Sequence, residues 1–99
     1  MEQWTKEQFE QYKVEGKVAL YVYTPMCGTC QVASRMMEVV THLVPHRKVG
    51  ALDLNFEEQL AITYEIESVP CLLIVDDGEI TKKVYAFQSV PYLYELLKN

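Results

Sequence analysis

The stretch that decides the fold is Tyr23-Thr24-Pro25-Met26-Cys27-Gly28-Thr29-Cys30-Gln31, in which two residues separate the two cysteines. A strand-like apolar run, Val18 to Tyr23, precedes it, and a helix-like run, Val32 to Val44, follows it. The first turn of a helix has unpaired N–H groups and partial positive charge, which favour a thiolate over a thiol. We therefore predict a thiol–disulfide exchange site. The alternatives are half of a zinc site, or two cysteines that merely lie near each other.

Length and composition predict one domain over residues 1–99 with a single modest core. The net charge of −5 argues against nucleic-acid binding, and the cationic pairs Arg47-Lys48 and Lys82-Lys83 are expected at the surface. The apolar runs are too short to span a bilayer, and residues 1–6 do not resemble a signal peptide. We therefore expect a cytoplasmic monomer without a membrane partner. In that compartment a C-x-x-C is more often catalytic or metal-binding than structural.

Caps and periodicity predict an α/β fold with a four-stranded mixed sheet and helices on both faces. The helices are expected from Thr5 to about Tyr12, from the C-x-x-C to about Val44, after a cap at Asn55, and after a cap at Ser89. The strands are expected at residues 18–23, 49–54, 71–75 and 80–85. The Asp77-Gly78 turn makes the last two strands antiparallel, whereas each β-α-β unit needs parallel strands.

Three features carry a family resemblance: Cys27-Gly28-Thr29-Cys30 between a strand and a helix, Ser68-Val69-Pro70 before an apolar strand, and the hairpin at Asp77-Gly78. In these features the chain resembles the thioredoxin family, from Thr5 onward. The resemblance implies a thioredoxin-like fold in which the Val69–Pro70 peptide bond is cis and faces the cysteines. It also implies that the Val69 backbone pairs with an extended substrate segment. The alternative for Pro70 is an ordinary trans proline that opens a strand.

Two departures from the family lie in the active-site loop. Met26 stands where thioredoxins usually have tryptophan, and it is still apolar enough to shield or contact a substrate. Thr29 stands where they usually have proline. It adds an N–H and a hydroxyl beside the sulfurs, and either group could donate a hydrogen bond to a thiolate.

Other departures concern the scaffold. Tyr21 aligns with the buried aspartate of the family, Ala51 with the lysine that pairs with it, and Arg35 with the proline that kinks the active-site helix. The usual proton acceptor for the second cysteine is therefore missing. The first strand of full-length thioredoxins has no room before Thr5, so we expect it to be absent.

The motif and the resemblance together predict a thiol–disulfide oxidoreductase that reduces or exchanges protein disulfides. Cys27 is expected to be the nucleophile and Cys30 the resolving cysteine. The residues expected to contact substrate are Met26, Gly28, Thr29, Val69 and Pro70. We expect no cofactor and no metal, because a separate reductase or a small thiol would supply the electrons.

Cys71, the third cysteine, leaves alternatives open. Free cysteine packs as a small hydrophobe, so Cys71 is expected to be an inert core residue; the alternatives are a third redox thiol or a site of glutathionylation-like capping. A metal or iron–sulfur site could use Cys27, Cys30 and Cys71, although closed zinc sites need four ligands. The chain could also be a redox-regulated interaction module that binds a partner through the Val69-Pro70 edge.

Overall fold

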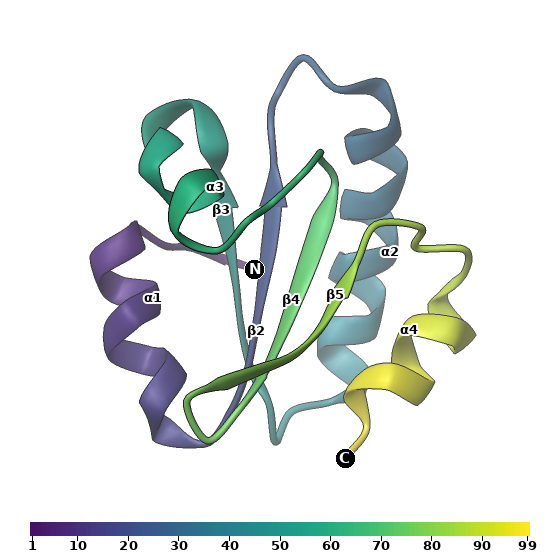
Figure 1. Ribbon diagram of the computed structural model, residues 1–99. Helices are drawn as coiled ribbons and strands as arrows, with labels where there is room; N and C mark the ends of the chain where they lie inside the picture. The colour runs from purple at the N-terminus through teal and green to yellow at the C-terminus, as the bar shows by residue number, and fades with distance from the viewer.

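The computed structural model describes residues 1–99. Its elements, in which η marks a 3₁₀ helix, are β1 (Glu2–Gln3), α1 (Lys6–Tyr12), η1 (Lys13–Glu15), β2 (Lys17–Tyr23), α2 (Gly28–Leu43), β3 (Lys48–Asp53), η2 (Leu54–Phe56), α3 (Glu58–Thr63), β4 (Cys71–Asp76), β5 (Glu79–Val84) and α4 (Val90–Leu97). One sheet lies between two helical layers, with α1 and α3 on one face and α2 and α4 on the other (Figure 1). None of the helices has the length and apolar character that crossing a membrane requires.

The sheet has five strands in the order β1-β3-β2-β4-β5. Strands β1, β3 and β2 are parallel, and β4 is antiparallel to both β2 and β5. The prediction of a mixed sheet flanked by helices, in a thioredoxin-like α/β fold, is confirmed. The hairpin between β4 and β5 turns at Asp77 and Gly78, whose φ angles of 52° and 90° are both positive, as a two-residue hairpin requires.

The prediction of four strands without the first one is wrong. Glu2 and Gln3 form a short parallel strand that pairs with Gly50 and Ala51 of β3. Gly50 makes this possible, because a Cβ atom there would lie 2.0 Å from the Trp4 ring. The N-terminal segment can therefore lie close against β3.

One predicted helix cap and one predicted surface residue are also wrong. Asn55 does not cap α3; instead, the Asp53 carboxylate accepts a hydrogen bond from the Asn55 N–H and begins η2. Arg47 is only 4% exposed, because its guanidinium reaches backbone carbonyls at the start of β2 and the end of β4. The caps predicted at Thr5 and Ser89 are present.

Apolar side chains fill both faces of the sheet. On one face, Ala19 and Tyr21 of β2 pack with residues of α2 and α4. On the other face, Leu20 and Val22 pack with residues of α1 and α3. Because β2 is buried from both sides, the loop that follows Tyr23 starts from a fixed point at the carboxyl end of the parallel strands.

Candidate active site

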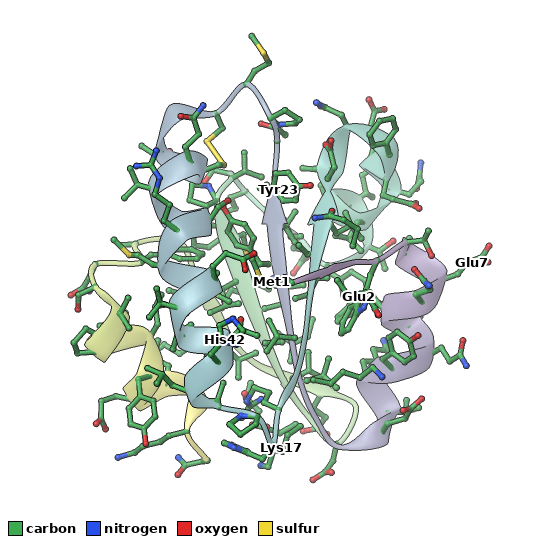
Figure 2. The ribbon with its side chains drawn as sticks, turned by 180° about the vertical axis from the view of Figure 1, so that it is seen from behind. Met1, Glu2, Glu7, Lys17, Tyr23 and His42 are labelled. Atoms are coloured by element: carbon green, nitrogen blue, oxygen red, sulfur yellow. A yellow bond between two sulfur atoms is a disulfide. The ribbon has the colours of Figure 1, made fainter.

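Cys27 and Cys30 form a disulfide at the first turn of α2 (Figure 2). Cys27 is the N-cap residue of this helix, with extended backbone angles, and its Sγ accepts a hydrogen bond from the Cys30 N–H at 3.1 Å. The sulfur thus occupies the place that a serine or aspartate oxygen takes in an ordinary cap. Cys27 is half-buried, whereas Cys30 is only 2% exposed.

Two further oxygen atoms lie near the Cys27 sulfur. The Thr29 hydroxyl oxygen is 3.3 Å from Sγ, and the Val69 carbonyl oxygen is 3.9 Å away. In the reduced state the Thr29 hydroxyl and the Cys30 N–H can both donate to a Cys27 thiolate. A hydrogen bond to a charged group contributes about 1.5–3 kcal/mol, so this arrangement favours the ionised sulfur. Gly28, the first residue of α2, is exposed and a Cβ there would have open space around it.

The Val69–Pro70 peptide bond is cis and lies beside the dithiol. An open cleft of about 480 Å³ adjoins it, and seven of its ten lining residues are hydrophobic. These residues come from α2, from the Val69-Pro70 segment and from the segment after β5: Thr29, Val32, Ala33, Met36, Val69, Pro70, Tyr85, Ala86, Phe87 and Gln88. The structure thus brings Thr29, Val69 and Pro70 together around one apolar cleft. Met26 lies outside this cleft and is 93% exposed.

Tyr21 lies directly beneath the dithiol, and its contacts were not predicted from the sequence. Its hydroxyl donates to the Cys30 carbonyl at 2.7 Å and lies 2.9 Å from the Ser34 hydroxyl. Since a carbonyl can only accept, the Tyr21 proton points to Cys30, and Ser34 donates to Tyr21. Burial raises the pKa of Tyr21, so the group stays neutral. The available signal was that a tyrosine in a strand buried on both faces needs a partner for its hydroxyl.

The scaffold positions that depart from the family lie close to one another. Tyr21 and Ala51 are register partners in β2 and β3, and both side chains are buried. A neutral hydroxyl and a methyl group therefore stand where the resemblance places a carboxylate and an ammonium group. Arg35 is exposed on α2, which runs without interruption from Gly28 to Leu43.

Cys71 lies away from solvent in the core between the sheet and α1 and α3. Its burial raises the pKa of the thiol to about 11, so it remains protonated and a poor nucleophile near neutral pH. This agrees with the expectation of an inert core residue. No three histidine, cysteine, aspartate or glutamate side chains lie close enough together to hold a metal ion. Cys27, Cys30 and Cys71 are therefore not gathered into one such group.

Comparisons with known proteins agree with this geometry. The family model described as "Thioredoxin" matches residues 1–99. The thioredoxin-like protein YusE of Bacillus subtilis strain 168 is 48% identical over 80 residues, which are 81% of this chain and 76% of that protein. The thioredoxin of the same strain is 27% identical over 96 residues, covering 96% of this chain and 92% of the relative.

Solved structures show the same fold. A mutant thioredoxin from Halobacterium salinarum NRC-1 has a TM-score of 0.88 at 22% identity, with 99% of this chain and 87% of that one covered. The thioredoxin of Trypanosoma brucei brucei has a TM-score of 0.84 at 17% identity, with 100% and 91% covered. Taken together with the Cys27–Cys30 pair at the start of α2, these matches show that the chain belongs to the thioredoxin family and is, at the level of that family, a thiol–disulfide oxidoreductase.

Proposed function

We propose that the chain is a protein-disulfide reductase in which Cys27 is the nucleophile and Cys30 is the resolving cysteine. The observation that carries the proposal is the asymmetry between the two sulfurs. Cys27 is half-buried at the helix cap and accepts the Cys30 N–H, whereas Cys30 is 2% exposed. A substrate disulfide can therefore reach Cys27 first.

The reaction is a two-step transfer of two electrons. The Cys27 thiolate attacks one sulfur of the substrate disulfide, and the other substrate sulfur leaves as a thiolate and takes up a proton. Cys30 then loses its proton and attacks the Cys27 sulfur. The second substrate sulfur leaves, and a Cys27–Cys30 disulfide remains. A separate reductase or a small thiol must return two electrons before the next cycle, and no cofactor or metal takes part.

Substrate binding is proposed along the Val69-Pro70 segment. The Val69 carbonyl oxygen lies 3.9 Å from the Cys27 sulfur, so an extended segment joined to Cys27 would pass beside the Val69 backbone. Pairing there would follow the strand-addition mode of peptide binding. Gly28 and Thr29 would lie beneath the segment, and the exposed Met26 would contact it from the loop. We further propose that residues 1–99 work as one domain, as a monomer, in the reducing environment of the cytoplasm.

The proposal is tested by trapping reaction intermediates. Cys30→Ala should accumulate mixed disulfides between Cys27 and substrate proteins, because the resolving step is lost. Cys27→Ala should trap none. Cys71→Ala is the matched control, and it should reduce insulin disulfides as the unaltered protein does. If the unaltered protein reduced no disulfide yet still bound partners, the chain would instead be an interaction module.

A further inference from the structure

A second cleft lies on the other side of β2, at the carboxyl ends of the parallel strands. It measures about 610 Å³ and is lined by Gln3, Trp4, Thr5, Tyr23, Asp53, Phe56 and Glu57. Tyr23 and Asp53 are register partners at the ends of β2 and β3. After Tyr23 the chain leads to α2 on one face of the sheet, and after Asp53 it leads to η2 and α3 on the other (Figure 1). Open α/β sheets bind ligands at such a reversal of direction.

The lining of this cleft combines aromatic rings with carboxylates. Phe56 is 84% exposed, so packing does not explain its presence. The Tyr23 ring is held in place, because it stacks on Tyr21 with centroids 5.6 Å apart and its hydroxyl donates to Gln3 at 2.8 Å. Aromatic faces attract Lys and Arg side chains, and a nearby carboxylate strengthens that attraction.

The carboxylates of the cleft have no cationic partner within the chain. The ion pairs of the protein involve Glu38, Glu10, Asp76 and Glu95, but neither Asp53 nor Glu57. Asp53 accepts a backbone hydrogen bond from Asn55. Burial and the nearby Asp53 carboxylate raise the pKa of Tyr23, so its hydroxyl stays neutral.

We propose that this cleft binds a cationic side chain, Lys or Arg, of the protein segment that carries the substrate disulfide. The inference rests on the proposed reductase function and adds a determinant of substrate choice. Tyr23 lines this cleft and also the smaller cleft beside Cys30, so the two sites are neighbours. Figure 2 shows Tyr23 at the end of β2, between the disulfide and the α3 segment. A residue a few positions from the substrate cysteine can therefore reach the cleft.

The test uses synthetic peptides, each with one cysteine in a disulfide with 2-mercaptoethanol. Arg is placed in turn at each of the four positions on either side of the cysteine. A second set carries citrulline, which has nearly the same shape without the charge. The ratio of kcat/KM for the Arg and citrulline peptides is measured at low salt and at 0.5 M NaCl. We expect a preference for Arg of about threefold to tenfold at one or two positions, and a smaller one at high salt.

The ratio of kcat/KM for the Arg and citrulline peptides, measured in each variant, shows whether this cleft binds the cationic side chain. Phe56→Ala and Glu57→Gln should each reduce the preference for Arg by at least half. Glu79→Gln removes the same charge from an exposed position at the start of β5, at the opposite end of the sheet, and should leave the preference unchanged. A ratio near one in the unaltered protein, or a preference that survives both cleft substitutions, would overturn this inference alone. Failure of the unaltered protein to reduce insulin disulfides would refute the proposed function, and this inference with it.

Discussion

At the start of β2, which we call the enclosed end, polar groups are buried and hydrogen-bonded within the chain. At the end of the same strand, which we call the reactive end, polar groups remain available to other molecules. At the start, Arg47 is 4% exposed, and its guanidinium donates to the backbone oxygens of Val18, Val75, Leu97 and Asn99 and to the Asp76 carboxylate. At the end, a cap N–H points at the sulfur of Cys27, which can exist as disulfide, thiolate or mixed disulfide. A buried network in which the polar groups are hydrogen-bonded, such as that of Arg47, stabilises the fold. A hydrogen bond to a sulfur that changes its bonding state, such as that of Cys27, supports chemistry.

Removing the enclosed network should have the largest effect on stability. Arg47→Met leaves several buried carbonyls without a donor, and each such group costs about 1–3 kcal/mol. We expect the free energy of unfolding, measured by urea denaturation, to fall by about 2–4 kcal/mol. Lys17→Met is the control, because it removes only a half-exposed ion pair to Asp76 and should cost less than about 1 kcal/mol. Equal losses in the two variants would mean that Arg47 is not the stabilising centre of that end.

Tyr21 lies between the two ends, and its hydroxyl should matter more than that of Tyr23. Tyr21→Phe leaves the partly buried Ser34 hydroxyl and the buried Cys30 carbonyl with fewer partners, and it should lower the free energy of unfolding by about 1–3 kcal/mol. Tyr23→Phe loses only an exposed hydrogen bond to Gln3, so we expect a change below about 1 kcal/mol. Urea denaturation of both variants checks this. A larger loss in Tyr23→Phe would contradict the account of Tyr21 as the support of the dithiol.

At the end of β2, the Thr29 hydroxyl should affect the reduction potential of the disulfide. Thr29→Val removes the hydroxyl that lies 3.3 Å from the Cys27 sulfur and keeps the shape of the side chain. The reduced state loses a hydrogen bond, so the reduction potential should fall by about 10–30 mV, where 30 mV equals 1.4 kcal/mol. Equilibration against glutathione measures it, with Thr24→Val as the control. An unchanged potential in Thr29→Val would show that the hydroxyl does not act on the sulfur.

The smallest effect on stability is expected when acid protonates Asp76, which lies at the enclosed end of β2. Burial acts to raise the pKa of Asp76, but the hydrogen bond from Lys17 and the charge of Arg47 outweigh it and hold the pKa of this carboxyl below its usual value. Because the folded pKa is lowered, Asp76 stabilises the fold above its unfolded pKa and loses that contribution as pH falls through the folded one. The urea midpoint of Asp76→Asn should therefore fall less steeply below pH 4 than that of the unaltered protein. Parallel profiles would contradict this.

The sequence predicted the reactive end better than the enclosed one. The C-x-x-C between a strand and a helix is a local pattern, whereas the place of the cis Val69–Pro70 bond beside it was implied only by the family resemblance. Arg47 was expected at the surface because its neighbour Lys48 is also cationic, and only the three-dimensional fold brings distant carbonyls to it. The two-residue strand β1 is too short to show alternation, and it depends on the space that Gly50 leaves for Trp4. The cleft beside Tyr23 joins three separate segments that no local pattern connects.

The most direct test of the account is the order in which the three thiols of the reduced protein react with iodoacetamide at pH 7, followed by peptide mass analysis. The account predicts that Cys27 is modified first and at least about tenfold faster than Cys71, because a helix N-terminus favours the reactive thiolate while burial keeps Cys71 protonated. Cys30 should follow Cys27, because it is almost completely buried. First modification of Cys30 or Cys71 would contradict the assignment of Cys27 as the nucleophile.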